Sequence, residues 1–134
     1  MTSTAAPLWK TITLWVLRLL IAALFLFAAY AKLTGDKMMV EEFGTVGLGQ
    51  WFRYFTGAME VVGSLLLLVP RVSAFGALVL LAVDAGAFVA QLAILHGDWI
   101  HTVVIGLVLL VLLWLQRDQF YSSPRFLGEG DRPA

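Results

Sequence analysis

Long apolar runs alternate with short polar breaks along the chain, a pattern typical of helices that cross a bilayer. A crossing helix needs about 20 mostly apolar residues, and the runs fall close to that length at residues 12–32, 52–69, 72–95 and 100–115. We therefore expect an all-α, membrane-spanning four-helix bundle with short loops, forming a single transmembrane domain over residues 1–134. The polar tail at 117–134 contains Pro and Gly and is expected to be poorly ordered.

The segment between the first two runs has a different character. Gly35 and Asp36 should stop the first helix, and apolar residues then flank a pair of glutamates at 38–43. An amphipathic stretch of this kind indicates a short helix lying in the membrane interface. Aromatic residues with one arginine follow at 51–55, which places the headgroup level at the start of the second run.

Composition supports a membrane protein and excludes several other classes. The chain is 60% hydrophobic and 13% charged, whereas about a quarter of an ordinary soluble domain is charged. Nine Lys and Arg balance nine Asp and Glu, so nucleic-acid binding is excluded. Without cysteine, the chain cannot form a disulfide or ligate an iron–sulfur cluster through its own thiolates. Any chemistry must sit in the bilayer or come from a partner.

Four crossings would put both termini on one side of the membrane. Positive charges favour the cytoplasmic side, and five lie on the terminal side against three on the other. We therefore expect both termini to be cytoplasmic, in a bacterial cytoplasmic membrane. The five are Lys10, Arg71, Arg117, Arg125 and Arg132, and the three are Lys32, Lys37 and Arg53.

Three ionisable residues, Arg18, Glu60 and Asp84, lie within predicted crossings. A lone charge there costs at least a few kcal/mol, so we expect Arg18 to pair with Glu60, or all three to meet. Because low dielectric disfavours charge, one carboxyl should be ionised and paired and the other protonated. Asp84 is the expected neutral acid if Arg18 pairs with Glu60. The alternative reading of the Arg18–Glu60 pair is a structural device that fixes helix register.

Helical periodicity places these residues on stripes that also carry small side chains, which indicates inward faces where backbones approach closely. A further stripe of small residues could pack the last helix or another subunit. The inward stripes are Arg18, Ala22, Phe25, Ala29, Lys32; Arg53, Gly57, Glu60, Ser64; and Asp84, Ala87, Phe88, Gln91; the further stripe is Ala82, Gly86, Ala90.

Two other polar groups are interpreted as structural. Lys32 lies at a helix end, from which its side chain can reach the interface. His96 and His101 with Asp98 are read as a solvated turn, so no metal site is expected.

Several short motifs resemble the DoxX-like family of small four-helix membrane proteins, over about residues 14–116. In the third crossing the chain departs from the family pattern, which has an apolar residue near Asp84 and a histidine near Gln91. The resemblance implies the four-helix fold and a shared inner site at Arg18 and Glu60. Some relatives resemble membrane subunits of oxidoreductases, including a thiosulfate:quinone oxidoreductase, and others resemble partners of soluble redox or stress enzymes. The motifs comprise Arg18, Ala23, Leu24, Phe25, Ala31, Lys32, Leu33; Phe43, Gly47, Leu48, Gly49, Gln50, Trp51, Phe52, Arg53; and Thr56, Gly57, Glu60, Leu67, Leu68, Val69, Pro70.

These observations favour a membrane subunit that holds a lipophilic ligand, such as a quinone or lipid, inside the bundle and serves a partner oxidoreductase rather than acting as a stand-alone enzyme. Arg18, Glu60, Asp84 and Gln91 are the residues expected to bind the ligand or exchange protons. A first alternative is a non-enzymatic accessory or assembly subunit, docking through the Ala82, Gly86, Ala90 stripe and the 35–50 segment. A second is proton-coupled transport of a small solute, which would require oligomerisation.

Overall fold

The computed structural model describes residues 7–121, and every regular element in that part of the chain is helical, as predicted. Four helices form the body of the molecule, a short helix joins the first two, and another ends the described part. A 3₁₀ turn precedes α4 and a π-helical segment extends it. The elements are α1 (Leu8–Thr34), α2 (Lys37–Val46), α3 (Gln50–Leu68), η1 (Pro70–Val72), α4 (Ser73–Val89), η2 (Ala90–Leu95), α5 (Ile100–Leu115) and α6 (Asp118–Tyr121).

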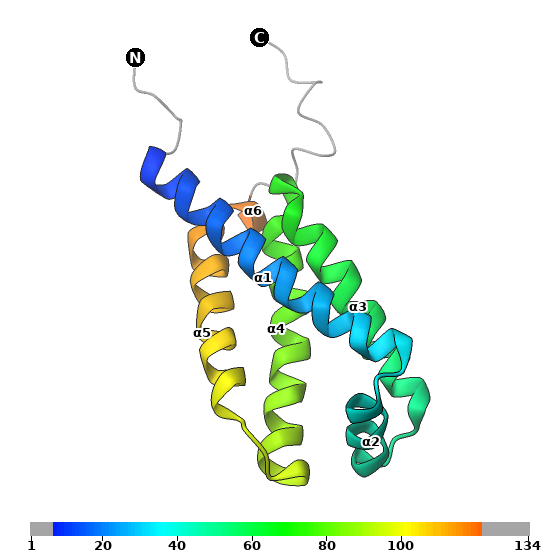
Figure 1. The fold of residues 1–134 in the computed structure, drawn as a ribbon. Helices are drawn as coiled ribbons and strands as arrows, with labels where there is room; N and C mark the ends of the chain where they lie inside the picture. Colours follow the sequence, from blue (N-terminus) through cyan, green and yellow to red (C-terminus); the bar gives the residue numbers. More distant parts are fainter. Residues whose placement is uncertain (1–6, 122–134) are drawn as a thin grey trace, which may run out of the picture.

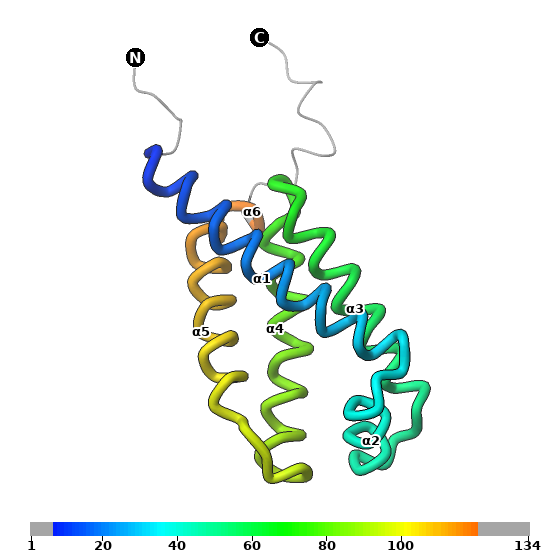
Figure 2. Tube along the Cα trace, viewed as in Figure 1, coloured from blue at the N-terminus to red at the C-terminus, as the bar shows by residue number. Residues whose placement is uncertain are grey.

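The four long helices run alternately up and down (Figure 1). The start of α1, the α3–α4 turn and the end of α5 gather at the end that carries α6, which we call the α6 end. At the other end, the α2 end, the chain leaves α1, turns through α2 and returns into α3 (Figure 2). Along α1, side chains that point toward the α6 end therefore have different neighbours from side chains that point toward the α2 end.

Local signals explain how α1 and α2 are bounded. Gly35 takes a left-handed conformation with φ of 77°, which ends α1 and costs least at glycine. The Asp36 side chain then accepts a hydrogen bond from the Met38 backbone N–H at 3.2 Å, which caps α2. The short helix predicted at 38–43 is thus present and is longer than expected.

Residues just after α5, which begin the tail expected to be poorly ordered, make long-range contacts, and residues 122–134 of that tail lie outside the described residues. The Gln119 side-chain amide accepts from the Ala74 backbone N–H at 2.8 Å and donates to the Pro70 carbonyl at 2.6 Å. The Phe120 ring packs edge-on against Phe75, with centroids 5.0 Å apart. These contacts fasten α6 to the α3–α4 turn.

Close packing is concentrated in the half of the bundle nearer the α6 end. There the buried core brings together apolar side chains of α1, α3, α4 and α5, among them Ile21, Leu67, Leu80 and Leu109. Glycine allows α3 and α4 to approach especially closely, because a Cβ on Gly76 would lie 2.4 Å from the Leu67 backbone nitrogen. Close packing therefore holds the four long helices together in this half.

The outer surface is strongly apolar. Leu20, Phe27, Leu65 and Leu107 are all more than half exposed, and many other large apolar residues of the long helices are similarly uncovered. Two helical stretches, Leu8–Thr34 and Pro70–Leu95, are long and apolar enough to cross a membrane, and α5 is a shorter apolar helix. An exposed apolar surface this extensive is unfavourable in water and suits a lipid environment.

The close approach of α3 and α4 makes Gly76→Ala destabilising. The added Cβ would overlap backbone atoms, and we expect the free energy of unfolding to fall by about 1–3 kcal/mol. Gly86→Ala on the same helix is the matched control, because a Cβ there has open space within 4 Å. Thermal unfolding of both variants in detergent measures the difference. Equal melting temperatures would show that α3 and α4 do not pack at Gly76.

Candidate ligand-binding cavity

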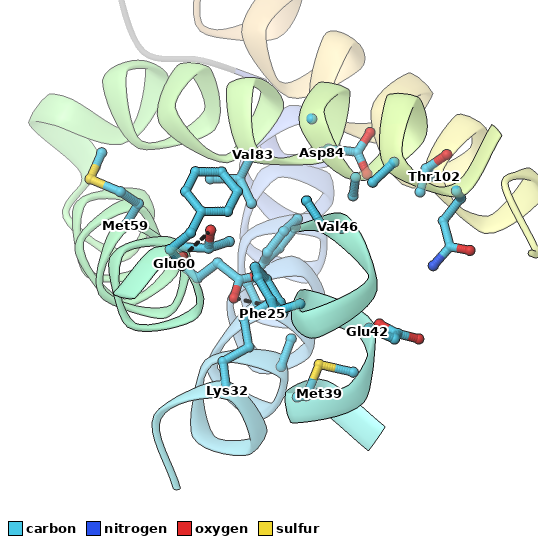
Figure 3. A pocket seen from close by; sticks show the side chains of 18 of the residues that line it. Phe25, Lys32, Met39, Glu42, Val46, Met59, Glu60, Val83, Asp84 and Thr102 are labelled. Atoms are coloured by element: carbon cyan, nitrogen blue, oxygen red, sulfur yellow. Dashed lines mark hydrogen bonds and ion pairs between the residues drawn. The ribbon is translucent and has the colours of Figure 1, made fainter. Parts of the chain in front are cut away.

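The half of the bundle nearer the α2 end contains a partly open cavity of about 1080 Å³. It lies between α1 and α3 on one side and α4, η2 and the start of α5 on the other, with α2 forming part of its wall (Figure 3). Apolar side chains such as Phe25, Met39, Met59 and Ile105 make up most of the lining. Ligand sites for small molecules occupy about 300–1,000 Å³ and combine apolar walls with a few polar groups. The cavity has the size and lining of such a site.

An ion pair lies on the α1–α3 wall of this cavity. The Lys32 ammonium of α1 is 3.0 Å from Glu60 Oε1 and 3.4 Å from Glu60 Oε2 on α3. The Glu60 side chain is 3% exposed and that of Lys32 14% exposed. Both residues line the cavity, where Figure 3 shows them joined. The pair brings a charged donor and a charged acceptor to the surface of an otherwise apolar space.

The direction of helical side chains explains why these two residues meet. A side chain on a helix leans toward the N-terminus of that helix. From Lys32, near the end of α1, this direction leads back into the bundle, and from Glu60 on the antiparallel α3 it leads toward the α2 end. The two side chains therefore converge.

Arg53 holds the α2 end of the same wall together. Its guanidinium donates to Gln50 Oε1 at 2.7 Å and to the Lys32 backbone carbonyl, and it lies over the Tyr54 ring with 4.3 Å from Cζ to the ring centroid. The Gln50 amide donates in turn to the Val40 carbonyl at 3.0 Å. This network connects the end of α1, α2 and the start of α3, so that Lys32 has a fixed backbone position.

Asp84 lies across the cavity from the ion pair, on α4 (Figure 3). It is 7% exposed, and no hydrogen bond or ion pair joins its carboxyl to another residue in the described part of the chain. Its Oδ2 packs against α5 at Gly106, where an added Cβ would lie 2.9 Å away. Asp84 therefore has no salt-bridge partner in the described part of the chain, although its carboxyl interacts electrostatically with His101. The expectation that Asp84 is the neutral acid depended on an Arg18–Glu60 pair, which is not formed.

Gln91 lies farther along the same wall, in η2. Its side chain lines the cavity, and its backbone carbonyl accepts from the Gly97 N–H at 3.1 Å in the turn that follows. The turn requires a left-handed conformation at His96, with φ of 51°. Short π-helical segments occur often at functional sites. This one ends α4 beside the cavity, and the chain turns there into α5.

Arg18 lies outside the cavity, and the predicted pair between Arg18 and Glu60 is wrong. The Arg18 side chain is buried near the α6 end, where its Nε donates to Ser73 Oγ at 3.1 Å and its Nη2 to Gln116 Oε1 at 2.5 Å. The Trp15 ring lies 5.0 Å from Cζ. Like Lys32, Arg18 leans toward the start of α1, which takes it away from Glu60. The triad of Arg18, Glu60 and Asp84 is therefore not formed.

The stripe Ala82, Gly86, Ala90 lines the cavity, and no atom outside its own stretch of helix lies within 4 Å of a Cβ placed on Gly86. It does not pack α4 against α5, which was one of its expected roles.

Within residues 7–121, no group of three His, Cys, Asp or Glu side chains could hold a metal ion. His101 and Asp98 form a pair at 3.5 Å in which both side chains are at least half exposed.

Sequence reasoning missed Lys32 as a member of the site, along with Ser73 and Gln116 as partners of Arg18. A signal for Lys32 was available, because it lies on the predicted inward stripe of α1, and that stripe is buried from Arg18 to Ala29. Its position at a helix end favoured an interfacial reading instead. No comparable signal marks Ser73 and Gln116, since their role depends on how three helices meet.

Long apolar helices with an exposed apolar surface are typical of an integral membrane protein. The chain belongs to the DoxX-like family, whose model matches residues 16–116. No curated protein and no solved structure matches it. The family match covers all four long helices in whole or part and agrees with the resemblance seen in the sequence.

The observed partners predict how substitutions couple. Lys32→Met and Glu60→Gln should each destabilise the protein, and the double variant should recover about 1–3 kcal/mol of the summed loss, because each single change leaves a buried group without its partner. Denaturant unfolding in detergent measures this coupling.

Arg18→Met and Glu60→Gln provide the matched control cycle. These residues have separate partners, so their effects should add to within about 0.5 kcal/mol. Strong coupling between Arg18 and Glu60, with none between Lys32 and Glu60, would contradict the observed pairing.

Proposed function

We propose that this DoxX-like membrane protein binds a lipophilic molecule with an uncharged polar head group, a quinone being the favoured class, in the cavity of its α2 half. The observation that carries the proposal is the cavity itself, which combines apolar walls, a buried ion pair and an acid without a paired cation in one space. We assign a structural role to Arg18, because its hydrogen bonds to Ser73 and Gln116 join α1 to α4 and to the end of α5.

The cavity residues fit a quinone head group. An ammonium has three N–H donors, and the contact with Glu60 leaves Lys32 able to donate to a carbonyl oxygen as well. Asp84 and Gln91 supply further hydrogen-bonding groups on the facing wall. A quinone, when bound, would supply the redox chemistry, while the residues of this chain would hold and orient it. Electrons would come from a partner oxidoreductase.

The same arrangement supports four membrane crossings. With a rise of 1.5 Å per residue, α3 would extend roughly 28 Å and α5 roughly 24 Å, close to the thickness of the hydrocarbon core. The charged residues of α3, Arg53 and Glu60, are both buried inside the protein, so they do not prevent the helix from crossing. The amphipathic α2 would lie at the membrane interface.

We further propose that the α6 end faces the cytoplasm of a bacterial cell. Lys10, Arg71 and Arg117 lie at that end, whereas of the three positive charges at the opposite end Lys32 and Arg53 are engaged inside the protein and only Lys37 remains. Arg125 and Arg132, which also contributed to the expected orientation, lie outside the described residues. The remaining asymmetry favours cytoplasmic termini.

The alternative of an accessory subunit relies on docking through a stripe of small residues on α4 and through the 35–50 segment. Ala82, Gly86 and Ala90 instead contribute to the cavity wall, where small side chains create space for a ligand. Binding of a lipophile is therefore the better-supported function.

Filling the cavity tests this proposal. Gly86→Phe places a large side chain in open space next to the cavity, so it should lower affinity for decylubiquinone at least about tenfold without loss of folding. Affinity can be followed by quenching of intrinsic Trp fluorescence, and folding by the melting temperature.

Ala85→Phe is the matched control, because Ala85 is exposed on the neighbouring face of α4, along the groove with α5. It should leave decylubiquinone affinity close to that of the unmodified protein. If the quinone neither quenches fluorescence nor raises the melting temperature of the unmodified protein, the proposed function is wrong.

A further inference from the structure

The charged side chains around the cavity bear on whether a ligand with an anionic or an uncharged head group can bind there. Two basic side chains, Lys32 and His101, line the cavity together with three acids, Glu42, Glu60 and Asp84. The acids therefore outnumber the bases, and an anionic ligand would need a positive charge that no acid of the protein already neutralises.

Each basic group has an acidic partner within the protein. Lys32 is paired with Glu60 at 3.0 Å. His101 lies 3.5 Å from Asp98, which would compensate its charge when the imidazole is protonated. Arg53 is committed to Gln50 and to a backbone carbonyl, and Arg18 lies in the other half of the bundle. No uncompensated cation of the described residues faces the cavity.

An anionic head group would meet an unfavourable environment there. A carboxylate or phosphate leaving water needs a cation and hydrogen-bond donors to offset its desolvation, and Asp84 and Glu42 would repel it when ionised. An uncharged carbonyl has a much smaller desolvation cost, and a hydrogen bond from the Lys32 ammonium is enough to offset it.

We propose that Glu60 determines head-group specificity: by neutralising Lys32, it makes the cavity reject anionic amphiphiles and accept uncharged ones. The inference rests on the proposed function and narrows its ligand class. A fatty acid or acidic phospholipid would then not compete with an uncharged ligand such as a quinone. Lys32 keeps its N–H donors while losing its net attraction for anions.

The test compares dodecanoate with dodecanol, which share one chain length and differ in the head group. Each competes with decylubiquinone for the purified full-length protein in an uncharged detergent at about pH 8, where the carboxylate is ionised. We expect dodecanoate to bind at least about tenfold more weakly than dodecanol. In Glu60→Gln, which frees the charge of Lys32, this ratio should shift by about tenfold or more in favour of dodecanoate.

Two further variants separate the role of Glu60 from a general loss of negative charge. Asp84→Asn removes another acid of the cavity without freeing Lys32, so the ratio should shift toward dodecanoate by clearly less than in Glu60→Gln. The double variant Lys32→Met/Glu60→Gln removes the cation together with the acid, so dodecanoate should stay excluded. A shift toward dodecanoate of about tenfold in the double variant would show that the negative charge of Glu60 acts without Lys32, and this result would overturn the inference even if Glu60→Gln alone does not fold.

The outcomes distinguish the specificity role of Glu60 from the proposed binding of a lipophilic ligand. If dodecanol and decylubiquinone bind but dodecanoate binds equally well, or if Glu60→Gln leaves the ratio unchanged, the specificity role is wrong and the binding function stands. If none of the three probes binds, both proposals fail.

Discussion

The interaction on which the open half of this bundle depends is the buried ion pair between Lys32 and Glu60. Two charges in a low-dielectric environment are tolerated when they neutralise each other at short range, and here their separation is 3.0 Å. The pair joins α1 to α3 in the α2 half of the bundle, where a cavity takes the place of the packed apolar core. It also brings hydrogen-bonding groups to the cavity wall without giving that wall a net charge.

The bundle consists of two halves with different tasks. Near the α6 end, close glycine packing, the buried apolar core and the Arg18 hydrogen bonds fix the four helices relative to one another. Near the α2 end, contacts are made mainly between α1, α2 and α3 through Arg53 and Gln50, and space remains beside α4 and α5. The closely packed half can thus hold the open half in place, and the proposed binding site lies in that open half.

The sequence predicted the helices well because hydropathy and helix-stop signals act locally. The range 100–115 matches α5, Gly35 ends α1 as expected, and the stripes through Arg18 and Glu60 are buried. The partners of these residues could not be predicted in the same way. Periodicity indicates which face a residue occupies, but the pairing of Lys32 with Glu60 also depends on the direction in which each side chain leans along antiparallel helices.

The most direct measurement of the central claim is photo-crosslinking with a diazirine-bearing quinone analogue, followed by mass spectrometry of the labelled peptides. If the cavity holds the ligand, labels should fall on cavity-lining residues such as Phe25, Met39 and Ile105, and excess decylubiquinone should prevent them. Labels confined to outward-facing residues such as Leu20 and Leu65, and insensitive to competitor, would show that the quinone meets this protein only as a component of the surrounding lipid.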